Sequence, residues 1–262
     1  MTKNTSWEPV EKWYRGSVGE EGHYYHQHLI LPGALRMLGL KEGDSLLDLA
    51  CGPGVLARYL PPQVHYTGVD LSPSFIKAAK IYDKDPHRLH RYLVGDAVQP
   101  LPLEKKDFSH CAIILAIQNI EFPEKAIKNA FLHLRPHGRL LLVMNHPCFR
   151  IPRQSSWKVD QEQKVQYRRI DRYSSPLSVP ITAHPSKKEQ GPASWSFHHP
   201  LADYSKALYE NGFLIEWLEE WHSDKKSTGG AAKMENRSRG EIPLFLAIRA
   251  VKASERPDDT FF

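Results

Sequence analysis

Three acidic side chains in the first half of the chain have the types and spacing to bind a nucleoside. Asp48 lies within the apolar run Leu46–Ala50, four residues before Gly52, and Asp70 and Asp96 each follow a later apolar run. A carboxylate at the end of a strand can accept hydrogen bonds from both ribose hydroxyls, and a second can accept from an adenine amino group. Each acid alone also fits a structural role, as an internal strand acid, a helix cap or a turn former. Their combined order is what predicts a nucleoside site.

A turn of small residues follows the first of these acids. Gly52 and Gly54 lack a Cβ atom, so they allow unusual backbone dihedrals and leave room for a ligand against the main chain. Such a turn at the carboxyl edge of a parallel α/β sheet is a common place for ligands to bind. Cys51 is interpreted as a small residue that lines the turn rather than as a nucleophile.

Two cofactors compete for this turn. The segment Gly52–Ala57 satisfies the dinucleotide fingerprint with alanine at its last position. Asp48, however, would repel the phosphates of a dinucleotide. S-adenosylmethionine carries an α-ammonium and a sulfonium but no phosphate, so a nearby carboxylate favours it. The sequence therefore predicts S-adenosylmethionine as the cofactor.

With these motifs, the chain resembles a class I S-adenosylmethionine-dependent methyltransferase of the small-molecule type, from about Gly33 to Val251. Ala50 stands where that family usually has glycine, and alanine is a tolerable substitute there if the backbone dihedrals of that residue are ordinary. The segment Phe213–Ile248 resembles the reversed terminal hairpin of the family, which dehydrogenases lack. The resemblance implies that the cofactor is bound by Asp48, Ala50, Cys51, Gly52, Gly54, Asp70, Leu71, Asp96, Ala97, Leu115 and Gln118.

The elements that must position these residues alternate along the chain. Helices are expected at 54–60, from Pro73 behind the N-cap Ser72, at 127–134 and at 204–209. The alternation predicts an α/β fold with a doubly wound, mostly parallel sheet, and the resemblance implies seven strands with a reversed C-terminal strand in a Rossmann-like methyltransferase fold. The apolar runs predict strands at 46–50, 64–69, 92–94, 111–117, 140–144, 213–217 and 245–248.

The regular core is expected to carry additions at both ends and in the middle. Residues 40–146 and 201–252 form the expected methyltransferase core. Residues 1–39 are expected to form an N-terminal helical lid, and 147–200 an insertion after the fifth strand that serves as a substrate lid. Within the core, residues 223–241 are polar and predict a mobile loop, and residues 253–262 a flexible tail.

Two histidines at the predicted ligand edge are candidates for a general base. Neutral imidazole is available near pH 7, so His146 or His198 could remove a proton from a hydroxyl or an amine. The alternative interpretation is that both histidines lie in loops and form hydrogen bonds within the protein. The spacing of His and Cys residues follows no metal-ligand rule, so no metal is predicted. The residues expected to contact the methyl acceptor are Tyr25, His28, Asn119, Arg150 and His199.

Composition narrows the class of protein. The chain has 262 residues, a net charge of +5 and three cysteines without a Cys-x-x-Cys pair. Its longest apolar run, Cys111–Ile117, is far shorter than the roughly 20 residues that span a bilayer, and no signal-peptide pattern begins the chain. We expect a soluble, cytoplasmic protein with a small-molecule methyl acceptor and no membrane partner, whose oligomeric state the sequence does not indicate.

One basic stretch keeps another class of partner open. The segment Arg153–Pro200 carries eight Lys or Arg residues against four Asp or Glu, and 167–173 interleaves tyrosine with arginine. This pattern could bind RNA through stacking and phosphate contacts, but a solvated antiparallel strand gives the same pattern. No RNA-binding module is recognisable, so we favour a lid over an anionic or aromatic small molecule. An RNA or protein methyltransferase and a non-catalytic cofactor-binding protein remain alternatives.

Overall fold

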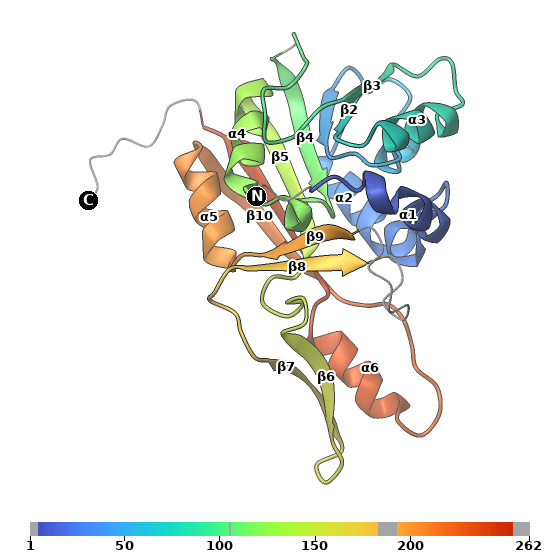
Figure 1. Cartoon of the computed structure of the whole chain (residues 1–262), viewed down its shortest axis with the longest axis vertical. Coiled ribbons are helices and arrows are strands. Elements are labelled where there is room, and N and C mark those ends of the chain that lie inside the picture. The colour runs from blue at the N-terminus through green and yellow to red at the C-terminus, as the bar shows by residue number, and fades with distance from the viewer. Residues whose placement is uncertain (1–4, 105, 183–192, 254–262) are drawn as a thin grey trace, which may run out of the picture.

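A seven-stranded sheet forms the centre of the protein (Figure 1). The computed structural model describes residues 5–104, 106–182 and 193–253. The strand order is β10-β11-β5-β4-β1-β2-β3, and β11 alone runs antiparallel to its neighbours. This confirms the predicted fold class, reversed strand included. The strands are β1 (Ser45–Leu49), β2 (His65–Asp70), β3 (His90–Val94), β4 (Phe108–Ile114), β5 (Leu134–Asn145), β10 (Phe213–Trp221) and β11 (Phe245–Lys252).

Helices cover both faces of this sheet, with one hydrophobic cluster on each face. On one face α4 (Pro123–His133) and α5 (Leu201–Glu210) pack on the sheet. On the other, α2 (Leu31–Leu38) and α3 (Pro73–Tyr82) do so. Because both faces are covered, the central strands β1 and β4 are buried along almost their whole length. The expected N-cap of α3 is present, since the Ser72 hydroxyl accepts a hydrogen bond from the backbone N of Phe75.

The prediction of a helix at residues 54–60 is wrong. Only a 3₁₀ turn, Leu56–Tyr59, follows the glycine turn. The Arg58 guanidinium donates to the carbonyl oxygens of Pro53 (2.8 Å) and Gly54 (2.9 Å), which the first turn of an α-helix would use. The pair Pro61–Pro62 then stops the segment before a second turn can form.

The polar segment 223–241, expected to be a mobile loop, contains α6 (Ala232–Glu241). This helix has no apolar face, which is the signal that predicts a helix from sequence. The helix is stabilised by a contact with another element of the chain, because the buried Ser238 hydroxyl donates to Oε1 of Gln166 at 2.5 Å. The loop interpretation is therefore wrong for the second half of the segment.

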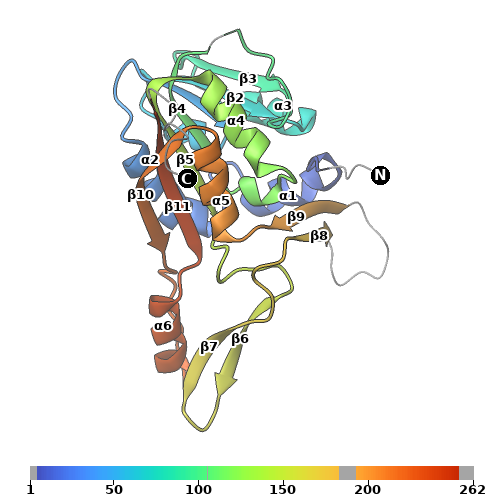
Figure 2. The same ribbon diagram turned by 90° about the vertical axis from the view of Figure 1, so that its left-hand side faces the viewer.

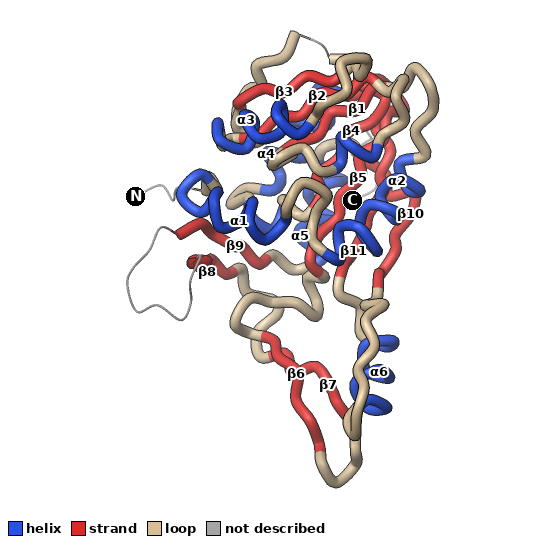
Figure 3. The backbone as a smooth tube through the Cα atoms, turned by 90° about the vertical axis from the view of Figure 1, so that its right-hand side faces the viewer, coloured by secondary structure: helices blue, strands red, loops and turns tan. Residues whose placement is uncertain are grey.

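The insertion after β5 folds into two antiparallel hairpins. The hairpin of β6 (Ser155–Asp160) and β7 (Val165–Ile170) projects away from the sheet together with α6 (Figure 2). The hairpin of β8 (Leu177–Thr182) and β9 (Ala193–His198) lies beside the N-terminal elements (Figure 3). Residues 183–192 of the insertion and 254–262 of the expected tail lie outside the described residues.

The N-terminal part of the chain is helical but irregular. A 3₁₀ turn (Glu8–Val10) leads into α1 (Glu11–Val18), and a π-helical turn (His26–Ile30) leads into α2. Turns of π-helix are rare and occur frequently at functional sites. Among all the helices described, none has the length and apolar character needed to cross a membrane.

Candidate active site

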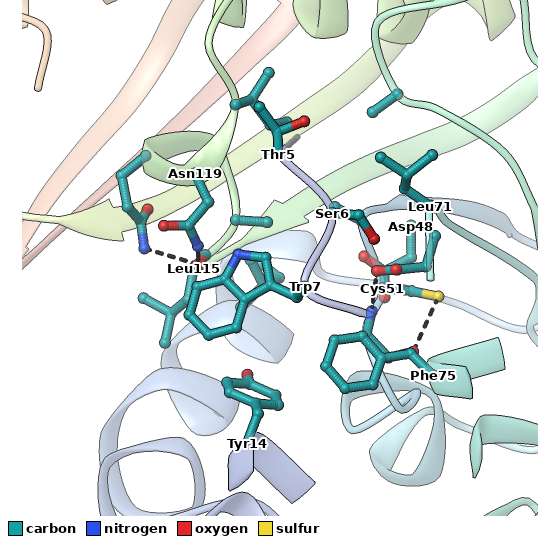
Figure 4. A pocket seen from close by; sticks show the side chains of 18 of the residues that line it. Thr5, Ser6, Trp7, Tyr14, Asp48, Cys51, Leu71, Phe75, Leu115 and Asn119 are labelled. Atoms are coloured by element: carbon teal, nitrogen blue, oxygen red, sulfur yellow. Dashed lines mark hydrogen bonds between the residues drawn. The ribbon is translucent and has the colours of Figure 1, made fainter. Parts of the chain in front are cut away.

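A cavity of about 660 Å³ opens at the carboxyl ends of the central strands (Figure 4). It is lined by the glycine turn after β1, by the ends of β2 and β4, and by the loop after β3. The N-terminal segment and the insertion supply further wall residues. Of the residues predicted to bind the cofactor, those that line the cavity are Asp48, Ala50, Cys51, Gly52, Asp70, Leu71, Asp96, Ala97, Leu115 and Gln118.

The glycine turn presents its backbone to this cavity. Gly52 has a φ of +55°, and no atom lies within 4 Å of the place where its Cβ would stand, so any side chain there would take up ligand space. Gly54, which does not line the cavity, has a φ of +71° and packs against Ala79 and Tyr92 instead. Ala50 has a φ of +57°, so the condition of ordinary dihedrals, under which alanine would be an easy substitute for glycine, is not met. An L-residue is strained in this left-handed conformation, which explains why glycine is usual there.

Asp70 ties the two turns of the site together. One carboxylate oxygen accepts from the backbone N of Gly52 (2.8 Å) and the other from that of Ser72 (2.8 Å). A carboxylate has about four lone-pair sites, so acceptor capacity remains for ribose hydroxyls. Burial raises the pKa of Asp70 to about 6, against the lowering effect of both backbone hydrogen bonds. The alternative role of Asp70 at the start of α3 is thus present as well, through its hydrogen bond from Ser72. Its carboxylate can still accept hydrogen bonds from a ligand.

Asp48 is buried beneath the turn. Its carboxylate accepts from the hydroxyl of Tyr66 at 2.8 Å, and not from the helix N–H groups of the alternative interpretation. Burial raises the pKa of Asp48 to about 7, and the neighbouring Asp70 adds to the rise. Burial also raises the pKa of the Cys51 thiol, which fits a turn-lining residue and not a nucleophile. A cationic ligand would relieve the unfavourable pairing of two buried carboxylates.

Leu115 and Gln118 at the exit of β4 form the opposite wall. Leu115 has a φ of +54° and is held there by its backbone N, which donates to the oxygen of Val143 at 2.7 Å. The side-chain nitrogen of Gln118 donates to the Leu115 oxygen at 2.7 Å. This leaves Oε1 of Gln118 buried without a hydrogen-bond partner in the described structure. An unpaired acceptor on a cavity wall suits a ligand that carries a hydrogen-bond donor.

Asp96, the acid predicted to lie near adenine, is consistent with both of its interpretations, as a turn former and as a ligand-binding residue. Oδ1 of Asp96 accepts from the backbone N of Val98 at 3.0 Å, as in a turn former, and Asp96 also lines the cavity. The adjacent wall residues Ala97 and Leu71 offer apolar surface to a flat base.

The sequence analysis missed several wall residues from the N-terminal segment. Trp7 packs edge-on against Tyr14, at 5.2 Å between ring centroids, inside the cavity wall (Figure 4). Glu8 anchors this segment, because its carboxylate accepts hydrogen bonds from Ser72 and Ser74 at the start of α3. These bonds, with that from the Ser72 side chain contributing most, hold the pKa of Glu8 below its ordinary value. A lone glutamate gives no sequence signal for such a contact.

Two more histidines, His23 and His26, line the cavity and were also missed. Burial lowers the pKa of His26 to about 3, and it lowers the pKa of His23 as well. Both rings are therefore neutral near pH 7. The signal in the sequence is the density of histidine and tyrosine at 23–28, where only Tyr25 and His28 are predicted as acceptor contacts. Tyr25 does line the cavity, whereas His28 stacks on Tyr24 outside it, at 4.4 Å between ring centroids.

The structure does not bring either candidate base to this cavity. Nε2 of His146 lies 2.7 Å from Oε1 of Glu220, and its Nδ1 accepts from the backbone N of Cys148 at 3.2 Å. His198 Nε2 lies 2.6 Å from the carbonyl oxygen of Tyr173, so it donates. His198 and His199 line a small adjoining cavity instead. Of the other predicted acceptor contacts, Asn119 and Arg150 line the main cavity.

Comparison with known proteins identifies the architecture. Residues 47–142 match the protein family described as Methyltransferase domain, and the solved structures with this fold include S-adenosylmethionine-dependent methyltransferases. Residues 47–142 thus resemble a methyltransferase domain, and the fold is the one found in S-adenosylmethionine-dependent methyltransferases. S-adenosylmethionine is the cofactor that this family and fold imply.

Several proteins are similar to this chain over part of its length. The chain is similar to a mouse 18S rRNA (guanine-N(7))-methyltransferase, with 36% identity over 88 residues, 32% of this chain and 30% of that protein. It is also similar to a demethylmenaquinone methyltransferase of Listeria welshimeri, with 24% identity over 115 residues, 42% of this chain and 48% of that protein. The chain thus matches about half or less of the length of these relatives.

Solved structures match over more of the chain. An S-adenosylmethionine-dependent methyltransferase from Mesorhizobium loti has a TM-score of 0.66 and 24% identity, covering 84% of this chain and 96% of that one. A putative methyltransferase of Haloferax volcanii, solved in a complex with the Trm112 activator, has a TM-score of 0.65 and 16% identity, covering 96% and 99%. At these identities the likeness shows the fold alone.

The wall of the cavity fits S-adenosylmethionine. S-adenosylmethionine offers an ammonium and two ribose hydroxyls as donors, and the wall offers acceptors in Asp48, Asp70 and the unpaired Oε1 of Gln118. The open backbone at Gly52 leaves space for a ligand against the main chain. Phosphates, by contrast, would meet two buried carboxylates.

Proposed function

We propose that the protein transfers a methyl group from S-adenosylmethionine to a small-molecule acceptor, at oxygen or nitrogen. One observation carries the proposal: a single cavity is lined both by the predicted cofactor residues and by the predicted acceptor residues Tyr25, Asn119 and Arg150. Its volume of about 660 Å³ lies within the range of roughly 300 to 1,000 Å³ that is usual for small-molecule sites.

The assignment of donor-binding residues is part of this proposal. Asp70 would accept from the ribose hydroxyls, Asp96 from the adenine amino group, and Asp48 would favour the cationic end of the donor through its charge. Leu71 and Ala97 would cover the faces of the base. Both residues already line the cavity, so no rearrangement of the backbone is required.

Alignment is the main contribution that this chain makes to catalysis. The sulfonium of the bound donor supplies a methyl carbon that is already activated for displacement, so the protein has to hold donor and acceptor in line and exclude water. We propose that the N-terminal segment and the β8–β9 hairpin serve as the lid. Thr5, Ser6 and Trp7 from the first and Ile181 and Ser196 from the second line the cavity. A general base at His146 or His198 remains a prediction that these cavity contacts do not support.

Calorimetry with S-adenosylhomocysteine tests the proposal. We expect micromolar affinity, about −8 kcal/mol. Asp70→Ala should weaken binding by about 1.5 to 3 kcal/mol because two charge-assisted hydrogen bonds to ribose are lost. Asp171→Ala, on the exposed hairpin where the residue pairs with Arg169 (2.6 Å), is the matched control and should bind normally. Binding of a nicotinamide dinucleotide in place of the nucleoside would refute the proposal. Mass spectrometry of a metabolite extract treated with labelled donor then identifies the acceptor.

RNA methylation is the second candidate, and the β6–β7 hairpin is the observation that favours it. This hairpin projects from the core (Figure 1), and Lys158 and Arg169 lie on it. The mouse relative is an rRNA methyltransferase by name. Methyl transfer to a structured RNA but to no molecule of the extract would favour this candidate. Its affinity for RNA would also fall steeply with salt.

A further inference from the structure

Arg150 stands at the acceptor side of the cavity on a turn that holds it firmly. Its backbone N donates to the carbonyl oxygen of His146 at 2.8 Å, which closes one turn after the end of β5. The His146 ring braces this turn from inside, since Nδ1 accepts from Cys148 N and the ring lies 4.7 Å from that of Phe149. The turn therefore fixes where the arginine enters the cavity wall.

Among the described residues, the guanidinium of Arg150 has no counter-ion. Across residues 5–104, 106–182 and 193–253, its side chain makes no hydrogen bond or ion pair with protein. Its neighbours are the ring of Phe245, 5.1 Å from the guanidinium carbon, and a second cation, Arg168. Burial, followed by the charge of Arg168, lowers the pKa of Arg150. A largely buried cation without an acid is costly unless a ligand supplies one.

Three of the four acids described in the cavity wall lie on its other side. Asp48 lies in β1, Asp70 ends β2 and Asp96 follows β3, whereas Arg150 follows β5, and β4 separates the two groups in the sheet. The fourth acid, Glu121, and the cation Lys125 both follow β4. The side of the cavity at β1 to β3 is therefore negative, and the side after β5, where Arg150 lies, is positive. Around Arg150 the walls are aromatic, since the rings of Tyr25 and Phe245 meet edge to face at 5.6 Å.

We propose that the methyl acceptor carries an anionic group, a carboxylate or a phosphate, that binds to the guanidinium of Arg150. The proposal rests on the methyl transfer proposed above and names the class of its substrate. Arginine suits the role because its planar fork matches the two oxygens of such a group. The aromatic walls favour a flat apolar body attached to the anion.

S-adenosylmethionine has a carboxylate of its own. The experiment must therefore distinguish binding of Arg150 to the carboxylate of the donor from binding of Arg150 to an anionic group of the acceptor. Arg150→Gln is compared with wild type and with Arg169→Gln, which removes the same charge from the exposed β7 strand. For the donor side, the probes are S-adenosylhomocysteine and 5′-methylthioadenosine, which lacks the amino-acid carboxylate. For the acceptor side, benzoate, phenylacetate and hexanoate are each compared with the matching neutral amide, on protein saturated with S-adenosylhomocysteine.

We expect at least one acid to bind wild type about tenfold more tightly than its amide, and Arg150→Gln to remove that preference. The affinity for S-adenosylhomocysteine should stay within about twofold of wild type, and Arg169→Gln should behave as wild type. Equal binding of every acid and amide overturns the proposal. So does a variant that binds S-adenosylhomocysteine more weakly but methylthioadenosine normally, because Arg150 would then hold the donor. Failure of wild type to bind S-adenosylhomocysteine at all refutes the proposed function instead.

Discussion

Replacing Ala50 by glycine should stabilise this protein, against the usual effect of that change. Ala50 has a φ of +57° in the glycine turn, where its Cβ crowds the following carbonyl oxygen. The left-handed conformation costs an L-residue about 1 to 2 kcal/mol. Glycine removes this cost, because it adopts positive φ as readily as negative φ.

The net gain is smaller than the strain. Glycine gives the unfolded chain more freedom, which costs about 0.5 to 1 kcal/mol relative to alanine. Ala50 is also partly buried beside the core, so some packing of its methyl group is lost. We therefore expect the free energy of unfolding to rise by about 0.5 to 1 kcal/mol, which corresponds to about 1 to 4 °C in melting temperature.

Ala202→Gly is the matched control. Ala202 lies in α5 and is exposed, so the same change there should destabilise the protein by about 0.5 to 1 kcal/mol. Urea unfolding followed by circular dichroism measures both variants, and an unchanged m-value would show that the unfolded states are comparable. If Ala50→Gly destabilises the protein as much as Ala202→Gly, the argument from backbone strain is refuted.

Three further predictions concern protons. Because burial raises the pKa of Asp48 to about 7 and that of Asp70 to about 6, the folded chain binds these protons more tightly than the unfolded chain, and the free energy of unfolding should fall as pH rises from about 4 to 7. The α-ammonium of S-adenosylhomocysteine favours the ionised carboxylates, so its binding should strengthen as pH rises from about 4 to 7 and should release protons. Calorimetry in buffers of different ionisation enthalpy measures this release, and proton uptake would contradict the prediction. His198→Ala should lower kcat less than about threefold on an acceptor found by the extract screen, since its Nε2 already donates to the Tyr173 oxygen, and a loss of about 10²-fold that shrinks at high pH would establish it as the base.

The sequence was sufficient to predict that the proposed donor residues come together, because their positions depend on local patterns. Asp48, Gly52 and Asp70 each lie at a strand end or in a tight turn, where strand periodicity fixes their position in the sheet. Parallel strands bring such ends to one edge, so three separate segments meet without any knowledge of side-chain packing. The cavity lining confirms that these residues come together.

Other features depend on contacts that no local pattern encodes. The polar helix α6 has no apolar face and is held by Gln166 of a distant hairpin. Glu8 reaches Ser72 and Ser74 across more than 60 positions of chain. The positive φ of Ala50 is a property of the turn and not of alanine, so the residue type does not indicate it.

The histidines show how a correct position along the chain can still give an incorrect environment. His146 follows β5 at the ligand edge, as predicted, but side chains alternate in direction along a strand, and the preceding residue Asn145 is the one that lines the cavity. His146 turns instead to Glu220 of β10 and braces the turn that carries Arg150. The exit of β5 therefore presents an amide and a guanidinium to the cavity, and neither group accepts a proton near neutral pH. An acceptor that ionises by itself, or whose leaving proton passes directly to water, suits such a wall better than one that depends on a histidine from this strand.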